Sequence, residues 1–396
     1  MKKIKKTKLM LAIYALHPIQ YQAPIFRKVA SSGEFDLTVL YGDDVGIRNF
    51  HQIEFSQSIV WDIPLLDGYK YKIMRNFKLL NRLPFFSRVN FGLIKEILFG
   101  KYDIILIHGY ETFSAWFVLI LAKLIKTKII FRGESIPKFD QETNIKIKIK
   151  EFLVKLFLKS SDAIMYSCAG NRKRWEQLGV KREKLFFMPC AVDNAYFQEK
   201  RTKTLPRRNE LRKGLGIPID SFVVLFPARF TGRKRPYDLI KAVEKLKDKN
   251  IYILFVGDGP ERRGIEEAVR VSQISAKFVG FVNQSKLPEY YTISDVAAVI
   301  SEYDASPKSI NEAMNFGLPI IVSDRVGTSA DLVENKGNGF VIKVGNVDEI
   351  AHSLEMLYKN QLLYSQMSTR SEEIVKNWNF DENVKALKKA SDSIIK

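Results

Sequence analysis

Residues 295–324 read DVAAVISEYDASPKSINEAMNFGLPIIVSD, and this stretch decides the fold. A short apolar run comes first, the polar loop 301–309 follows, and a helix-like segment occupies Ile310–Phe316. A Gly-Leu-Pro turn then ends the helix and leads into a second apolar run. Buried strand, helix and buried strand in this order are typical of a parallel sheet covered by helices. Ser306 or Ser309 is expected to cap the helix.

The same alternation extends outward through the whole chain. Short runs rich in Ile, Val and Phe are separated by segments long enough for helices, with six runs in each half. Two such series predict an α/β fold of two doubly wound, Rossmann-like domains that face each other across a cleft. The predicted strands are Lys8–Ala15, Phe35–Tyr41, Asp103–His108, Lys128–Arg132, Ala163–Ser167, Lys184–Met188, Phe222–Ala228, Ile251–Gly257, Lys277–Gly280, Asp295–Ile300, Pro319–Ser323 and Gly339–Ile342.

A polar segment separates the two series of strands. Between about residues 194 and 218 the sequence is charged and poorly periodic, which is typical of a linker. We therefore predict a first domain over residues 1–196 and a second over residues 197–376. Residues 377–396 read as a C-terminal helix, for which packing back on the first domain is one arrangement.

Composition limits the classes of protein that fit. The chain has 396 residues and a formal net charge of +19, which favours anionic partners such as phosphorylated substrates, acidic lipid headgroups or nucleic acid. The two cysteines, Cys168 and Cys190, exclude a disulfide-rich scaffold and are expected to be small buried hydrophobic residues. The apolar run Ala115–Ala122 is too short to span a bilayer, and the first apolar run lacks a cleavage site, so we expect a cytoplasmic protein.

Polar residues that follow strands in the second half point to a ligand site, because open α/β sheets bind ligands at the carboxyl ends of their strands. Arg229 and Lys234 follow one strand and precede a predicted helix at Tyr237–Lys247. Two cations beside a helix N-terminus suit a diphosphate, although solvated surface charge would look the same. Gly257 lies in a glycine turn, but Arg262 stands where a dinucleotide fingerprint needs its third glycine, so no nicotinamide or flavin cofactor is expected.

The ordered set of motifs resembles the retaining GT-B glycosyltransferases of family 4, the glycosyl transferases group 1. The resemblance covers nearly the whole chain, and the set is specific although each motif alone is weak. The motifs are the strand Asp103–Gly109 that ends in histidine, the interdomain signature Pro189–Phe197, Arg229-x4-Lys234, Gly257-Asp258-Gly259-Pro260, Asp304-x7-Glu312-Ala313-Met314 and Gly317-x-Pro319.

This resemblance implies a nucleotide-diphosphate sugar as donor, held mainly by the second domain. Arg229 and Lys234 would bind the diphosphate, and Glu312 would bind the nucleotide ribose. Asp304 would face the transferred sugar; it replaces the family's usual Glu and is one methylene shorter. The Pro-Lys pair after it resembles a variant of the family's loop. The remaining donor-binding residues would be Gly257, Ser306, Pro307, Lys308 and Ser309.

The first half supplies candidates for the other side of the cleft. His108 would line the cleft near the donor sugar by its position in the family, although a lone histidine after a buried strand is more often structural. His17, Arg132 and Glu134 are assigned to the acceptor side. Glu134 either contacts an acceptor hydroxyl or pairs with Arg132, and the sequence leaves both open.

The resemblance also implies a mechanism. Same-face substitution is favoured, with the leaving diphosphate accepting the proton of the acceptor. A covalent route would need a placed carboxylate, for which Asp304 is the matched candidate. The chain has no Asp-x-Asp pair and no zinc-ligand spacing, so no metal is expected. Arg229 and Lys234 would instead neutralise the leaving group.

A membrane surface is a further expected partner, together with a glycan or lipid-linked glycan acceptor. Ile145–Lys159 mixes Lys with large apolar residues, with strand-like alternation in its first part and helical spacing in its second. This segment is either a core helix with a solvated face or, with Lys2–Lys8 and Arg82–Arg88, a contact to an anionic membrane. The second reading implies a peripheral enzyme on the inner face of the cell membrane.

Three other functions share part of this pattern. A non-hydrolysing nucleotide-sugar epimerase would share the fold, and fold alone does not fix function. An inactive nucleotide-sugar-binding subunit would share the donor residues. A nucleic-acid-binding protein would explain the charge, but no recognised module is visible, and no nucleic-acid partner is expected. The spacing from Asp304 to Glu312 favours transfer.

Overall fold

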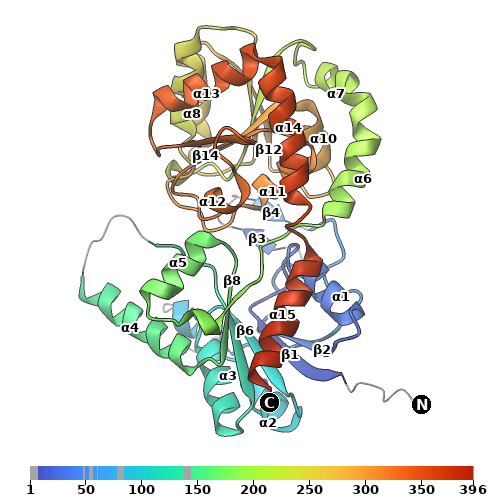
Figure 1. The fold of residues 1–396 in the computed structure, drawn as a ribbon, viewed down its shortest axis with the longest axis vertical. Coiled ribbons are helices and arrows are strands. Elements are labelled where there is room, and N and C mark those ends of the chain that lie inside the picture. Colours follow the sequence, from blue (N-terminus) through green and yellow to red (C-terminus); the bar gives the residue numbers. More distant parts are fainter. Residues whose placement is uncertain are drawn as a thin grey trace.

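The computed structural model has two α/β domains, one above the other in Figure 1. Each domain is built on one parallel sheet with apolar side chains packed on both of its faces. This arrangement confirms the predicted fold class of two Rossmann-like domains. The structure describes residues 8–47, 50–52, 57–59, 61–77, 84–137 and 144–395.

The first sheet has seven parallel strands in the order β5-β2-β1-β6-β7-β8-β9. Six of them match predicted strands, and the edge strand β5 was missed because its Lys-Tyr-Lys-Ile sequence is exposed throughout. A separate antiparallel pair, β3 and β4, was also missed. The bounds are β1 (Leu9–Ala15), β2 (Phe35–Tyr41), β3 (Phe50–Gln52), β4 (Gln57–Ile59), β5 (Lys70–Ile73), β6 (Ile104–His108), β7 (Lys128–Arg132), β8 (Ala163–Tyr166) and β9 (Leu185–Phe187).

The second sheet has six parallel strands in the order β12-β11-β10-β13-β14-β15. All six were predicted, and the Val, Ile and Phe residues of the five strands other than β12 are mostly buried because helices cover both faces, while the edge strand β12 is half-buried throughout. Full burial of one such side chain stabilises the fold by about 2 kcal/mol. The bounds are β10 (Phe222–Pro227), β11 (Ile251–Val256), β12 (Ser275–Gly280), β13 (Val296–Val299), β14 (Ile320–Ser323) and β15 (Gly339–Ile342).

Helices connect the strands and cover the sheets. The strand-like alternation at the start of the segment 145–159 was misleading, since the whole segment is helical and Asn144 caps it by accepting a hydrogen bond from the Ile147 N–H at 3.0 Å. The bounds are α1 (Ala23–Ser31), α2 (Gly92–Phe99), α3 (Phe113–Leu124), α4 (Ile145–Ser160), α5 (Ala169–Gln177), α6 (Asn194–Thr204), α7 (Arg208–Gly214), α8 (Pro236–Leu246), α9 (Arg262–Ser272), α10 (Leu287–Ile293), α11 (Lys308–Asn315), α12 (Ser329–Leu332), α13 (Val347–Lys359), α14 (Gln361–Val375) and α15 (Phe380–Ile394). Among these described helices, none has both the length and the apolarity to cross a membrane.

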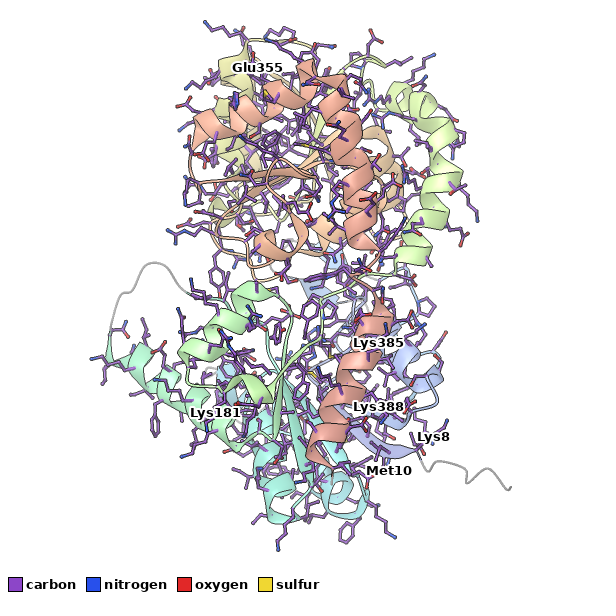
Figure 2. The ribbon with its side chains drawn as sticks, in the orientation of Figure 1. Lys8, Met10, Lys181, Glu355, Lys385 and Lys388 are labelled. Atoms are coloured by element: carbon purple, nitrogen blue, oxygen red, sulfur yellow. The ribbon has the colours of Figure 1, made fainter. Side chains whose placement is uncertain are left out.

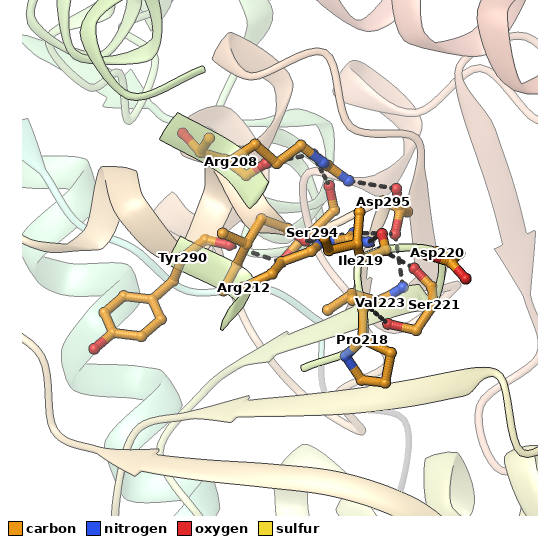
Figure 3. Close-up of polar contacts among 12 residues, drawn as sticks. Arg208, Arg212, Pro218, Ile219, Asp220, Ser221, Val223, Tyr290, Ser294 and Asp295 are labelled. Atoms are coloured by element: carbon orange, nitrogen blue, oxygen red, sulfur yellow. Dashed lines mark hydrogen bonds and ion pairs between the residues drawn. The ribbon is translucent and has the colours of Figure 1, made fainter. Parts of the chain in front are cut away.

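The prediction of a linker between about residues 194 and 218 is wrong, because helices α6 and α7 occupy most of this segment. Arg208 and Arg212 of α7 both pair with Asp295, at 2.6 and 2.8 Å (Figure 3). Arg212 is only 3% exposed and also donates to the carbonyls of Ile293, Ile219 and Ser221. Arg208 and Arg212 therefore anchor a helix to the second domain rather than belonging to a loop. Removing one partner of such a buried pair costs about 3–5 kcal/mol.

The C-terminal helix α15 lies against the first domain. Leu387 is fully buried among residues of the first sheet and α1. The Asn383 side chain donates to the Pro189 carbonyl at 2.7 Å, and Lys28 of α1 pairs with Asp381 at 2.8 Å. Figure 2 shows Lys388 on α15 in the lower half of the molecule, where its Nζ lies 3.9 Å from a Glu34 carboxylate oxygen. The helix thus joins the end of the chain to the first sheet.

The two domains touch where α5 of the first meets two loops of the second. The Gly170 N–H donates to the Gly327 carbonyl at 3.1 Å, and the Cys168 thiol donates to the Ala305 carbonyl at 3.3 Å. Both glycines are needed for this approach. A Cβ on Gly170 would lie 2.8 Å from the Gly327 Cα, and one on Gly327 would lie 2.4 Å from the Ala305 oxygen. The two domains are therefore in close backbone contact at this point.

Candidate active site

Two loops of the second domain bring a lysine and an aspartate together. Lys234 follows β10 and Asp304 follows the neighbouring strand β13, and their side chains form an ion pair. Both are largely buried, at 14% and 19% exposed. The Glu302 N–H donates to the Arg233 carbonyl at 2.8 Å and ties the two loops together. Arg229, half-buried, lies in the same loop as Lys234. The predicted diphosphate and sugar residues thus share one location, with Lys234 already neutralised by Asp304.

The glycine turn after β11 has a steric cause. Gly257 has φ of +138°, and a Cβ there would lie 2.0 Å from the Ala228 carbonyl oxygen. Its N–H donates to the Gly280 carbonyl at 2.8 Å. Only glycine allows the turn to approach the loop after β10 so closely. Gly257 therefore fixes the position of the loop that carries Arg229.

The start of α11 corrects the capping prediction. Pro307 occupies the N-cap position and has no side-chain acceptor, so neither Ser306 nor Ser309 caps the helix. Ser306 lies one residue before the cap, and its buried hydroxyl has no hydrogen-bond partner in the described part of the chain. Lys308 curls back and donates to the Ser306 carbonyl at 3.1 Å. The N–H groups of the first turn of α11 are consequently left without a side-chain cap.

Glu312 is a buried carboxylate with one oxygen engaged. It is 2% exposed and accepts a hydrogen bond from the Tyr291 hydroxyl at 2.6 Å, while its Oε1 has no partner among the described residues. Burial raises the pKa of Glu312, and the Tyr291 hydrogen bond, the nearby Tyr21 hydroxyl and the charge of Lys308 oppose the rise. Neither tyrosine was identified from the sequence, since each comes from a different element with no motif of its own. The second oxygen remains available to a ligand hydroxyl.

A cavity of about 340 Å³ lies at the carboxyl ends of β6 and β7 in the first domain. Lys308 of α11 also lines it, so both domains contribute. Three residues predicted for the first-domain side of the site, His108, Arg132 and Glu134, line this cavity together. His17, the fourth, is not among the lining residues.

Charged groups surround Glu134 at this cavity. The Cys190 thiol donates to Glu134 Oε1 at 2.7 Å, and nitrogen atoms of Arg132 and Lys308 each lie 3.9 Å from the carboxylate. Burial would raise the pKa of Glu134, but Lys308 and Arg132 lower it further, to about 2. Glu134 is therefore ionised and does pair with Arg132. Cys190 is buried as expected, but as a hydrogen-bonding group rather than a plain hydrophobic residue.

His108 is uncharged near neutral pH. Burial, with a smaller contribution from the charge of Arg132, lowers the pKa of His108 to about 4. The Gln22 amide nitrogen lies 3.2 Å from both ring nitrogens. A neutral imidazole can donate or accept a hydrogen bond but carries no positive charge. Gln22 had no sequence signal, because it precedes α1 and reaches His108 only through the tertiary fold.

His17 has a different environment. Its pKa is lowered by burial, with Asp43 raising it and Arg88 lowering it. Arg88 and Asp43 form an ion pair at 2.5 Å. The Nδ1 atom of His17 is buried without a partner in the described structure. His17 thus belongs to the loops at the end of β1, but not to the cavity.

Unpartnered buried atoms occur on both sides. A buried polar atom without a partner costs about 1–3 kcal/mol, so such atoms mark places where water or a ligand completes the structure. In the described residues these include Gln22 Oε1 and Arg132 Nε in the first domain, and Ser306 Oγ and Glu312 Oε1 in the second. No group of three or more His, Cys, Asp or Glu side chains suited to a metal ion occurs among the residues that the structure describes. The arrangement suits a hydroxyl-rich ligand that contacts both domains.

Comparisons with known proteins show which proteins the chain resembles. Residues 207–374 match the family described as glycosyl transferases group 1. One relative is N-acetyl-alpha-D-glucosaminyl L-malate synthase of Bacillus anthracis, 28% identical over 167 residues, or 42% of this chain and 44% of that enzyme. Another is UDP-Gal:alpha-D-GlcNAc-diphosphoundecaprenol alpha-1,3-galactosyltransferase of Escherichia coli, 26% identical over 307 residues, or 75% of this chain and 77% of that enzyme. The first alignment spans less than half of the relative's length.

The whole chain also resembles a solved structure. Anabaena Alr3699/HepE in complex with UDP matches with a TM-score of 0.73 at 17% identity, over 98% of this chain and 100% of that one. At this identity the likeness concerns the fold alone. The chain therefore has the GT-B fold, and its residues 207–374 carry the predicted resemblance to the glycosyl transferases group 1.

Proposed function

We propose that this protein is a retaining, metal-independent glycosyltransferase that moves a sugar from a nucleotide-diphosphate sugar to a glycan or lipid-linked glycan. The observation that carries the proposal is the meeting of Lys234 and Asp304 at the carboxyl ends of two neighbouring strands. Further support comes from HepE, which has the same fold and was solved with UDP and with UDP-glucose. The Escherichia coli relative uses UDP-Gal and a diphosphoundecaprenol-linked acceptor, as its name states.

The second domain would hold the donor. Arg229 and Lys234 bind the diphosphate, and Lys234 leaves Asp304 or shares it when the phosphate arrives. Glu312 accepts a ribose hydroxyl at its unpartnered oxygen, which needs no loss of the Tyr291 hydrogen bond. The uncapped start of α11 adds backbone donors and a positive dipole end. The other donor-binding residues are Gly257, Ser306, Pro307, Lys308 and Ser309.

The first domain would hold the acceptor. Arg132 offers hydrogen bonds at the cavity, and ionised Glu134 accepts one from an acceptor hydroxyl. His108 lines the same cavity and would orient the donor sugar beside the acceptor. His17 would reach the acceptor only from outside the cavity. We keep the division into a first domain over 1–196, a second over 197–376 and a C-terminal helix over 377–396.

The proposed reaction is a same-face substitution. The bond from the anomeric carbon to the diphosphate oxygen breaks, and the acceptor oxygen bonds to that carbon on the same face. The acceptor proton passes to the departing phosphate oxygen. Arg229 and Lys234 neutralise the charge that develops there, and Asp304 orients Lys234 while facing the sugar. The protein contributes position and charge, and closure of the domains excludes water.

A thermal-shift measurement tests the donor class. UDP, GDP, ADP, CMP and their sugar conjugates are each added at about 100 times the dissociation constant, where binding adds about 2.7 kcal/mol to stability. One nucleotide diphosphate should raise the Tm, and Arg229→Ala should abolish the rise while the unliganded variant still unfolds cooperatively. No shift with any nucleotide would contradict the donor assignment.

Two rival functions leave different traces. An epimerase would convert the sugar nucleotide to an isomer without transfer, which product analysis by NMR detects. An inactive binding subunit would show the thermal shift without turnover under any acceptor. Turnover by the unaltered chain that falls in Glu312→Gln at subsaturating donor, with an unchanged fold, would exclude the inactive subunit.

We also propose a membrane contact on the first domain. Helix α3 contacts both α2 and α4, and together they expose large apolar side chains among exposed Lys95, Lys123, Lys146 and Lys150. Apolar insertion combined with Lys on anionic headgroups is the pattern of a peripheral protein. The apolar side chains that are more than half exposed are Phe99, Ile120, Leu124, Ile145, Ile149 and Phe152.

Lys2–Lys8 and Arg82–Arg88 were the other two segments predicted to contact a membrane. Lys2–Lys6 and Arg82–Leu83 lie outside the described residues. Phe86 packs on Phe113 with ring centroids 5.7 Å apart, and Arg88 pairs with Asp43, so this end of the segment is engaged within the domain.

Co-sedimentation with vesicles of anionic phospholipid tests the contact. Phe152→Glu should reduce binding at least tenfold at low salt, whereas Leu362→Glu should not, because Leu362 is equally exposed but lies on α14 of the other domain. Equal loss in both variants, or no binding of the unaltered chain, would contradict the proposal.

A further inference from the structure

The cavity between α1 and the first sheet has two unlike ends. Its inner walls are apolar and come from β1, α1, β6 and the segment after β9, whose side chains belong to one hydrophobic cluster. Its outer end is charged and faces the second domain through Lys308. The apolar lining includes Ile13, Ile25, Phe26, Val29, Leu106 and Met188. A ligand that fills the cavity must therefore be apolar at one end and polar at the other.

The charges at the outer end balance each other. Two carboxylates, Glu111 and Glu134, and two cations, Arg132 and Lys308, line the cavity, while His108 is neutral. An anionic ligand group would meet ionised Glu134, and a cationic one would meet Arg132 and Lys308. Each would also lose hydration on entry, which is costly for an ion. The lining thus disfavours a ligand group of either charge.

Unpartnered polar atoms show what the cavity does favour. Arg132 is 5% exposed, yet its Nε–H has no acceptor among the described residues. Gln22, which also lines the cavity, has a buried amide oxygen without a donor. A hydroxyl or ether oxygen accepts from the first atom, and a hydroxyl donates to the second. Both are satisfied by an uncharged sugar or alcohol.

We propose that this cavity is a subsite for an uncharged acceptor, whose apolar group lies against α1 and whose hydroxyl end lies at Arg132 and Gln22. The volume of about 340 Å³ holds roughly ten groups of about 30 Å³ each, which matches a medium-length alkyl chain or an aromatic ring system. The inference rests on the proposed function, because it names the acceptor class of that transferase. It separates this chain from a transferase whose acceptor is a small acid.

A photoreactive glycoside tests the subsite on the full chain. The probe is an octyl β-D-glucopyranoside with a diazirine at the end of the chain, used below its micelle concentration, and labelled peptides are mapped by mass spectrometry. Labelling should fall on α1, at Ile25, Phe26 or Val29, or on Met188. Octyl β-D-glucopyranoside should compete at least tenfold better than methyl β-D-glucopyranoside. Labelling confined to α4, or equal competition by both glycosides, would overturn the proposal.

A second probe tests the charge argument. The same diazirine chain ending in a carboxylate should label α1 at least tenfold less than the glucoside. Stronger labelling by the anionic probe would overturn the proposal in favour of an acidic acceptor such as L-malate.

Filling the cavity gives an independent measurement. Val29→Phe should abolish α1 labelling, and an unchanged thermal shift with UDP in that variant shows that the fold and the donor site persist. If Val29→Phe fails to fold, the competition between the two glycosides on the unaltered chain still decides the question. A thermal shift with UDP but no labelling of α1 would contradict the acceptor subsite and leave the proposed transferase function standing. Labelling of α1 without a thermal shift for any nucleotide would contradict the transferase function instead.

Discussion

The two sides of the candidate site satisfy their polar groups in different ways. In the second domain, Lys234 pairs with Asp304 and Glu312 accepts from Tyr291, so the charged residues have partners from their own domain. In the first domain, Arg132 and Gln22 each keep a buried atom that has no partner among the described residues, around an open cavity. On the proposed function, Lys234 would bind its ligand by exchanging the partner Asp304, whereas the first domain would bind by filling space. The effects of substitutions on the two sides should differ in magnitude and in the kinetic constant that changes.

The largest effect is expected for Lys234→Met. This change removes a cation from the leaving group and leaves Asp304 buried without a partner, so kcat/KM for the nucleotide sugar should fall about 1,000-fold, or about 4 kcal/mol. Steady-state transfer assays with one acceptor measure it. Lys245→Met is the matched control, because Lys245 pairs with Asp348 on an exposed surface and should keep full activity. Equal activity of both variants would remove Lys234 from the mechanism and leave only the stabilising ion pair.

A smaller effect is expected for Glu312→Gln. Glutamine still accepts the Tyr291 hydrogen bond, but it offers a ribose hydroxyl a neutral oxygen, so KM for the donor should rise about 30-fold, or about 2 kcal/mol. Isothermal titration with the nucleotide and the unliganded Tm separate binding from folding. Glu355→Gln on α13, at the far end of the second domain in Figure 2, is the control and should change neither value. An unchanged donor affinity in Glu312→Gln would limit Glu312 to its contact with Tyr291.

On the first-domain side, Glu134→Gln should change acceptor kinetics alone. It removes one hydrogen-bond acceptor, so kcat/KM for the acceptor should fall about tenfold while the nucleotide thermal shift stays the same. It also leaves Arg132 and Lys308 with an excess of positive charge, so Glu134→Gln should accept anionic acceptors better than the unaltered enzyme does.

In the unaltered enzyme, a pKa of about 2 keeps Glu134 ionised, and its titration should contribute no change in rate between about pH 5 and pH 9. A donor-binding defect in Glu134→Gln would contradict the division between the two sides.

The sequence was most informative where an apolar run fixes a strand. All twelve predicted strands are present within two residues of their predicted ends, since continuous burial on both faces requires the composition that the pattern detects. Prediction failed where polar residues are buried in pairs. Arg208 and Arg212 resembled a linker, although Asp295 fixes them to the second domain. A pairing partner more than 80 residues away leaves no local signal.

The same distinction explains the site. The spacing of the motifs in the family resemblance singled out Lys234, Asp304 and Glu312. The neutral partners of Glu312 and His108 were not predictable, since Tyr291 and Gln22 reach them only through tertiary contacts. The role of Cys190 as donor to Glu134 was likewise invisible, because the contact spans 56 residues. The sequence alone therefore identified the charged candidate residues of the second domain, but not the neutral residues that hydrogen-bond to the site residues in both domains.

The smallest expected effect concerns Asp331, which lies at the contact between the two domains. Asp331 of α12 accepts a hydrogen bond from the Ala169 N–H of α5 at 2.8 Å, across the contact between the domains. Burial raises the pKa of Asp331 from 3.8 to about 6, against the opposing effect of the Ala169 hydrogen bond and Arg172. The folded state holds this proton more tightly than the unfolded state. The stability that the protonated Asp331 contributes is therefore fully present below about pH 4 and is lost as the pH rises through 6.

Asp331→Asn does not titrate and keeps an acceptor for the Ala169 N–H. Its stability relative to the unaltered chain should therefore grow from pH 4 to pH 6 and level off above, at about 1 kcal/mol. Urea unfolding at pH 4 and pH 7.5 measures this difference. A stability difference that does not change with pH would mean that Asp331 is not buried at a domain contact, and the two sides of the site would then be separate in solution.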